Sequence, residues 1–242
     1  MTSNVLLELK EVHTHIGAYH ILHGVNLQIP RGELTLLLGR NGAGKTTTLR
    51  TIMGLWQASQ GTVNFNGHDI THMTTPDIAS LNIAYVPENM GIFSDLTVEE
   101  NMLLAARKAS HAQQMDAERL AWIYAMFPAV EKFWHHPAGK LSGGQKQMLA
   151  VARAMVEPRD LLIVDEPSKG LAPAIVQNMI DAFQIMKASG VSILLVEQNI
   201  HFAEQLGDSV AVMDNGRVIH AGSMAALSAD PALQQSLLGL AL

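Results

Sequence analysis

Apolar segments with two different periodicities run through the first part of this chain. Residues 5–12 and 24–29 alternate between apolar and polar side chains, which is typical of strands with one buried face. Residues 34–38 are almost all apolar, which predicts a parallel strand buried on both faces. Leu49 and Ile52 then share one face of a helix. The pattern predicts two half-buried strands, followed by a buried strand, a loop and a helix in that order.

The middle of the chain has a helical pattern, and strand patterns return after it. A capping box at Thr97 opens one predicted helix, Pro128 stops another, and Met148, Val151 and Met155 share one face of a third. Later apolar runs predict further strands, at residues 161–164, 191–196, 209–213 and 217–220.

These patterns predict one α/β domain that fills all 242 residues. Its core comprises residues 1–87 and 158–225 and includes an antiparallel β part near the N-terminus. A helical subdomain at residues 88–157 interrupts this core. Residues 226–242 form a C-terminal helical tail.

Composition narrows the classes of protein that fit this pattern. The net charge is −6, which argues against a domain that coats nucleic acid, since such domains are usually strongly basic. The chain has no cysteine, so disulfides and thiolate metal sites are excluded. Its apolar runs are far shorter than the roughly 20 residues that a membrane-spanning helix needs. We therefore expect a chain that does not itself span a membrane.

A glycine-rich loop follows the buried strand at residues 34–38. The sequence from Gly39 to Thr46 fits the pattern G-x-x-x-x-G-K-[ST] and lies between a predicted strand and a predicted helix, as a phosphate-binding loop requires. Glycines let successive backbone N–H groups point at an anion, and the helix N-terminus adds positive potential. Lys45 is expected to contact the β- and γ-phosphates of a nucleotide, and Thr46 to offer its hydroxyl to Mg²⁺. The sequence predicts a P-loop NTPase core of the RecA-like type.

Two acidic residues end the apolar strand at residues 161–164. Asp165 and Glu166 lie where the strand meets the carboxyl edge of the sheet, which is the usual ligand-binding edge of α/β proteins. Asp165 can hold Mg²⁺ directly or through water, and Glu166 can polarise an attacking water. Alone, the pair is equally consistent with two solvated acids at a strand end. Together with the phosphate loop, it predicts a nucleotide-hydrolysing site.

A second glycine motif comprises residues 141–145, Leu-Ser-Gly-Gly-Gln. Ser142 and Gln145 form a capping box, so the motif is at least a good helix start. A helix N-terminus with two glycines is also a second anion site. One nucleotide does not need two such sites in the same chain. We therefore expect this helix to cover the γ-phosphate that a partner subunit holds.

The two motifs and their spacing resemble the ATP-binding-cassette (ABC) ATPases over nearly the whole chain. The resemblance rests on the phosphate loop and on Leu141, Ser142, Gly143, Gly144 and Gln145, which look like the family's signature sequence. Finer details are similar to one branch, the shorter ATPase subunit of branched-chain amino-acid importers. These details are residues 85–88, 96–101, 147–150, 165–173 and 196–199.

The resemblance implies a role for each matched residue. Glu166 would be the general base, and Asp165 would support magnesium together with Thr46. Residues near 88–98 would sense membrane subunits. The ATP-binding residues would be Gly39, Arg40, Asn41, Gly42, Ala43, Gly44, Lys45, Thr46 and Thr47. The loop that crosses the dimer seam would be Ser168, Lys169, Gly170 and Leu171.

Three positions depart from the pattern of the broad family. Glu88 replaces the usual glutamine, although the resembling branch also has glutamate there, and it could still reach magnesium. Gln198 aligns with the histidine that senses the γ-phosphate, and an amide cannot carry a proton. The aromatic residue that stacks on adenine aligns with Ile16, with Tyr19 three residues later. ATP binding is still expected, while the rate of hydrolysis at this site becomes an open question.

The resemblance implies an ATP-hydrolysing subunit on the cytoplasmic face of the inner membrane. Its expected partners are a second cassette of a different sequence, transmembrane permease subunits and, indirectly, an extracytoplasmic substrate-binding protein; nucleic acid is not expected. Branched-chain amino acids are the first cargo to consider, with urea, short amides, aromatic acids or a lipid as alternatives. A non-hydrolysing regulatory cassette also stays open because of Gln198. A cassette ATPase of repair or translation and a small-molecule kinase fit the sequence less well.

Overall fold

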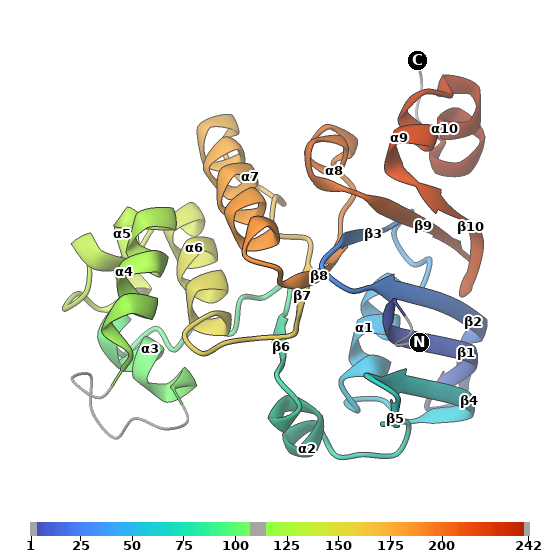
Figure 1. The fold of residues 1–242 in the computed structure, drawn as a ribbon, viewed down its shortest axis with the longest axis horizontal. Coiled ribbons are helices and arrows are strands. Elements are labelled where there is room, and N and C mark those ends of the chain that lie inside the picture. The colour runs from blue at the N-terminus through green and yellow to red at the C-terminus, as the bar shows by residue number, and fades with distance from the viewer. Residues whose placement is uncertain (1–3, 107–114, 240–242) are drawn as a thin grey trace.

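Two β-sheets and a group of helices make up the fold, which is shown as a ribbon in Figure 1. The structure is a computed structural model, and it describes residues 4–106 and 115–239. The smaller sheet is antiparallel and has the strand order β2-β1-β4-β5. The larger sheet has the order β10-β9-β3-β8-β7-β6, in which all neighbours are parallel except β9 and β10.

The chain begins with strands, and consecutive helices separate β6 from β7. The strands are β1 Val5–Ile16, β2 Tyr19–Pro30, β3 Leu34–Gly39, β4 Ala58–Phe65, β5 His68–Asp69, β6 Ile83–Val86, β7 Leu161–Asp165, β8 Ser192–Val196, β9 Ser209–Asp214 and β10 Arg217–Ser223. The helices are α1 Lys45–Ile52, α2 Thr75–Ser80, α3 Val98–Ala105, α4 Ala117–Met126, α5 Pro128–Lys132, α6 Gly143–Ala154, α7 Pro173–Ala188, α8 Ile200–Leu206, α9 Met224–Ser228 and α10 Pro231–Leu238, with a 3₁₀ turn at Ala138–Lys140.

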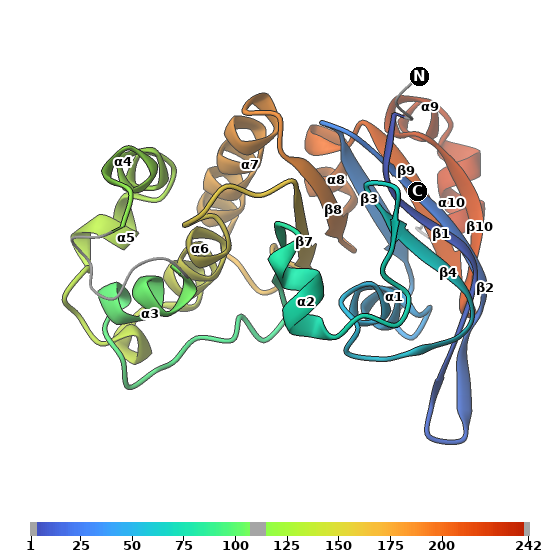
Figure 2. The ribbon, with the colours of Figure 1, turned by 60° about the horizontal axis from the view of Figure 1, so that its bottom comes forward.

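Helix α1 lies between the two sheets, as Figures 1 and 2 show. Leu49 and Ile52 of this helix are fully buried in a core that both sheets share. Leu37 of β3 faces that core, whereas its neighbour Leu36 faces the opposite side of the sheet. The alternation follows from the pleat of a strand that is buried on both faces. The loop that precedes α1 is therefore held between two layers.

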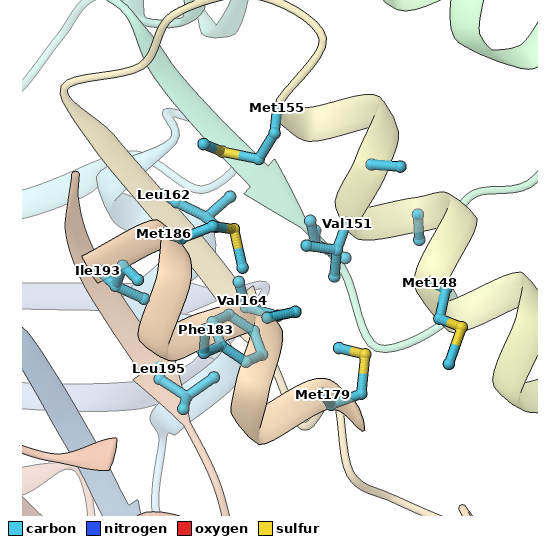
Figure 3. Close-up of a cluster of buried hydrophobic side chains, with 14 of the residues drawn as sticks. Met148, Val151, Met155, Leu162, Val164, Met179, Phe183, Met186, Ile193 and Leu195 are labelled. Carbon is cyan, nitrogen blue, oxygen red and sulfur yellow. The ribbon is translucent and has the colours of Figure 1, made fainter. Parts of the chain in front are cut away.

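A second core joins the larger sheet to helices α6 and α7. Figure 3 shows side chains of β7 and β8 in contact with those of the two helices. Phe183 of α7 is fully buried and meets Phe202 of α8 edge-to-face at a centroid distance of 6.1 Å. The methionines in this cluster, such as Met148 and Met179, fill the space between the elements. This packing connects the helical half of the chain to the strands that carry the acidic residues.

The structure confirms the expected α/β fold, with an antiparallel β part and inserted helices. It also contains elements that the sequence pattern did not predict. Helix α7 has Ala172 as its N-cap and therefore no side-chain cap, although Pro173 at its first position is a start signal. Strands β1 and β2 run on to Ile16 and Tyr19, through a histidine-rich stretch without clear alternation. Among the described residues, no helix is long and apolar enough to span a bilayer.

The burial of Phe183 predicts how much this side chain contributes to the stability of the fold. Phe183→Ala removes a fully buried ring and should lower the free energy of unfolding by about 3–5 kcal/mol. Ile185→Ala on the same helix is a matched control, because Ile185 is 43% exposed. The control should cost less than about 1 kcal/mol in urea unfolding. Equal effects of the two substitutions would contradict the packing described here.

Candidate functional site

The glycine loop connects the end of β3 to the start of α1. Gly39 has a φ of 144°, and a Cβ there would lie 2.3 Å from the carbonyl oxygen of Met213. Gly44 has a φ of 106° and caps α1 without a side chain. Glycine is favoured at both positions because both φ values are positive, and backbone atoms also close the space beside Gly39. The remaining loop residues, Arg40, Asn41, Gly42 and Ala43, lie between them.

Lys45 is the first residue of α1, and its side chain folds back over the loop. Its ammonium group donates hydrogen bonds to the carbonyl oxygens of Gly39 and Arg40, at 2.8 and 3.1 Å. The group also lies 3.8 Å from a carboxylate oxygen of Glu166. Burial lowers the pKa of Lys45, and the negative charges of Glu166 and Asp165 oppose that shift. The loop therefore carries a nearly buried cation beside a bare helix N-terminus, which together suit an anion.

Asp165 ends β7 at the carboxyl edge of the larger sheet. Its side chain is fully buried, and neither carboxylate oxygen has a hydrogen-bond partner in the described part of the chain. Burial raises the pKa of Asp165 to about 6, and the side chain of Thr46 opposes the shift. A buried carboxylate without a partner next to a threonine hydroxyl fits a hard cation such as Mg²⁺, which takes oxygen ligands. Thr47 follows half-buried in α1.

Glu166 has a left-handed backbone conformation with a φ of 50°. Such a conformation is unfavourable for a residue other than glycine and is often found at functional sites. The amide of Gln198 donates to Oε1 of Glu166 and also to Oδ1 of Asn41, the latter at 2.8 Å. Gln198 thus bridges the loop and the acidic strand end. Its amide group is neutral, so it donates a hydrogen bond at this position without carrying a charge.

Glu88 lies beyond β6, at the same edge of the sheet. Lys169 donates to Oε1 of Glu88 at 2.6 Å and lies 3.4 Å from Oε2 of Glu166. The hydrogen bond from Lys169 to Glu88 and the two negative charges raise the pKa of the lysine. The charge of Glu88 is also among the causes that raise the pKa of Asp165. A magnesium contact of Glu88 stays a prediction, since its direct partner here is a lysine.

Glu197 is a site residue that the sequence reasoning did not single out. It is buried, and it accepts backbone hydrogen bonds from Ser168 at 2.9 Å, Gln198 at 3.1 Å and Asn199 at 3.2 Å. These bonds tie the loop at residues 168–171 to the end of β8. Burial raises the pKa of Glu197, and the backbone bonds oppose the shift. The sequence signal for Glu197 was its position directly after an apolar strand.

The second glycine motif opens α6. Ser142 and Gln145 form the predicted capping box, with both reciprocal hydrogen bonds present, and Leu141 precedes it as a buried residue. Gly143 faces open space, whereas a Cβ on Gly144 would lie 2.8 Å from Ile175 of α7. Figures 1 and 2 place α6 and α1 in different halves of the molecule. The structure therefore does not bring the motif to this chain's own phosphate loop.

Ile16 and Tyr19 face each other at the tip of the β1–β2 hairpin. Tyr19 is 75% exposed, so its ring is free to stack on a planar group. Neighbouring imidazoles form a stack that the sequence did not predict, with His15 and His20 centred 4.2 Å apart. The contact of Ile16 or Tyr19 with adenine stays a prediction.

The unpartnered carboxylate predicts a cost to stability. A pKa of about 6 means that the charged form of Asp165 destabilises the fold by on the order of 3 kcal/mol at pH 7. Asp165→Asn should therefore stabilise the nucleotide-free chain in urea unfolding with a chelator present. Asp181→Asn, at an exposed position of α7, is the matched control and should have little effect.

The stability difference between the Asp165→Asn variant and the natural chain should depend on pH. The folded-state pKa of Asp165 lies above its ordinary value, so the folded chain binds this proton more readily than the unfolded chain. The destabilisation is present above about pH 6 and is lost as the pH falls toward 4. The gap between the variant and the natural chain should shrink between pH 7 and pH 5. A gap that stays constant would contradict the buried, unpaired state of Asp165.

Comparisons with known proteins agree with this geometry. Residues 22–169 match the family described as ABC transporter. The High-affinity branched-chain amino acid transport ATP-binding protein BraG of Pseudomonas aeruginosa is 37% identical over 97% of this chain and 100% of its own length. The Glutamine transport ATP-binding protein GlnQ of Bacillus subtilis is 29% identical over 93% of this chain and 94% of its own. The structure of cbiO1 from Clostridium perfringens superposes with a TM-score of 0.82 at 26% identity, covering 97% and 94% of the two chains. This chain therefore belongs to the ABC transporter family and is one of its transport ATPases.

Proposed function

We propose that this chain is the nucleotide-binding subunit of an importer for branched-chain amino acids. The proposed ATPase activity is supported by the arrangement of Lys45, Asp165 and Glu166, which lie together at one edge of the sheet in a fold of transport ATPases. The cargo rests on the name of BraG, which aligns with this chain over nearly its whole length. The similarity to GlnQ keeps other amino acids as alternatives, and urea, short amides and aromatic acids remain alongside them.

The residues divide the chemistry of phosphoryl transfer between them. The loop N–H groups and Lys45 hold the phosphates, and Thr46 with Asp165 would hold Mg²⁺, which neutralises charge on the phosphate oxygens when bound. Glu166 accepts the proton of the attacking water. Gln198 orients Glu166, because its amide already reaches that carboxylate. Catalysis in this class of reaction depends mainly on such positioning and charge stabilisation.

A second cassette completes the site. The start of α6 at Ser142 and Gly143 lies in the half of the molecule away from α1, so it is placed to cover the nucleotide of a facing cassette. Closure excludes water from both nucleotides, and loss of the γ-phosphate lets the pair reopen. We propose that the facing cassette is a different chain and that Ser168–Leu171 form the loop at their seam.

A groove beside Glu88 is the proposed docking surface for the permease. It has a volume of about 780 Å³ and lies between the α/β core and the helical half. Apolar side chains and arginines line it, including Tyr85, Met90, Leu104 and Arg153. Docking there would place the ATPase on the cytoplasmic face of the inner membrane. Its cycle of closing and opening would drive the permease, to which an extracytoplasmic binding protein delivers cargo.

The lysine of the phosphate loop gives the first test of nucleotide binding. Lys45→Ala removes a charge and its hydrogen bonds from the phosphates and should weaken ATP binding by roughly 10- to 100-fold. Lys10→Ala is a matched control, because Lys10 is exposed and pairs with Glu8 on the smaller sheet. Titration with a fluorescent ATP analogue measures both. Unchanged affinity in the Lys45 variant would show that the phosphates bind elsewhere.

The absence of native cysteine permits a direct test of the paired cassettes. Gly143→Cys places a thiol at the open start of α6, where a photoreactive maleimide can be attached. In a Glu166→Gln background with MgATP, the probe should label the phosphate loop of the facing cassette, as identified by mass spectrometry. A probe at Glu118→Cys on the exposed side of α4 is the control and should not label it. Labelling that ignores ATP would argue against the proposed closure.

A further inference from the structure

Lys169 lies between two carboxylates that come from distant parts of the chain. Its ammonium group is 2.6 Å from Oε1 of Glu88 and 3.4 Å from Oε2 of Glu166. A turn holds the lysine close to Glu166, since the backbone N–H of Lys169 donates to the carbonyl of Glu166 at 3.3 Å. The shorter contact is the one to Glu88, which is 81 positions away. The lysine therefore connects the loop after β6 to the acidic end of β7.

The contact to Glu166 occupies the one carboxylate oxygen that other groups leave open. Oε1 already accepts from Gln198 and faces Lys45, and Oε2 faces Lys169. Glu166 is 9% exposed, whereas Lys169 is 59% exposed. The carboxylate of Glu166 is therefore shielded from water, whereas the exposed side chain of Lys169 can move away from it. Each carboxylate oxygen keeps a second lone pair, so the ammonium group does not fill Oε2, but it competes with an attacking water for that oxygen.

We propose that Lys169 is a positioning residue that holds Glu166 in a resting state and makes its release depend on Glu88. The proposal rests on the assignment of Glu166 as the general base. Lys169 keeps Oε2 engaged while the cassette is idle. When Glu88 moves outward, the lysine follows its closer partner and leaves Glu166. Oε2 is then free to accept a proton.

The position of Glu88 would allow a partner in the adjacent groove to influence Lys169. The residues on either side of it, Pro87 and Asn89, line the groove beside β6. Glu88 itself is 48% exposed. A partner seated in the groove would contact the residues on either side of Glu88 and could shift this loop. In the proposed link, that shift reaches Glu166 through the side chain of Lys169. No other described residue bridges Glu88 and Glu166 by a hydrogen bond or ion pair.

A double-substitution cycle in the purified transporter, with its native partner chains, tests the link. Lys169→Met keeps the length of the side chain and removes its charge, and should raise the kcat of unstimulated ATP hydrolysis about threefold with KM for ATP unchanged within about twofold. Lys169→Arg keeps the charge and should restore the low rate. Glu88→Gln leaves the lysine with Glu166 alone and should lower kcat about twofold. In the Lys169→Met background, Glu88→Gln should change kcat by less than its effect alone.

The results show whether Lys169 connects Glu88 to Glu166. A Lys169→Met rate equal to that of the natural chain, or a Glu88→Gln effect that persists fully without the lysine, would overturn the proposal. A change in KM alone would assign Lys169 to nucleotide binding and would also overturn it. Glu166→Gln is measured in parallel. If that variant hydrolyses ATP normally, the assignment of the base fails; if it is inactive while Lys169→Met changes nothing, only the link fails.

Discussion

The structure depends on a cluster of charges that converge where parallel strands end. β7, β8 and the loop after β3 deliver Asp165, Glu197 and Lys45 to one edge of the larger sheet, and all three are buried. A buried charge is costly unless it is paired or binds an ion. Glu197 is balanced by backbone N–H groups and Lys45 by loop carbonyls. The side chain of Thr46 and the charge of Lys45 offset the burial of Asp165 only in part, since its pKa is still raised. This deficit supports the proposal that the edge binds a cation together with a nucleotide.

The two cores explain how the chain maintains this arrangement. One core holds α1 between the sheets, and the other packs α6 and α7 against β7 and β8. The phosphate loop and the acidic strand end thus sit on a rigid frame. The start of α6 belongs to the helical half, so the same packing keeps the second glycine motif away from the phosphate loop. This separation supports the proposed pairing with a second cassette.

Local signals made much of this site predictable from sequence. The glycine loop depends on backbone geometry at Gly39 and Gly44, which residue identity alone specifies. The capping box of α6 is equally local. The contacts of Lys169 and Glu197 were not predictable, because they join residues far apart in sequence and depend on burial. Helix α7 was missed because its N-cap is an alanine, which leaves Pro173 at the first position as the start signal.

In the proposed function, ATP completes its own site by joining two cassettes. A structure of the assembled transporter, carrying Glu166→Gln and with MgATP bound, tests this arrangement. We expect the γ-phosphate between Lys45 of one cassette and the N-terminus of α6 of the facing one, with Mg²⁺ against Asp165. A bound ATP whose γ-phosphate meets only solvent on the side away from Lys45 would contradict it.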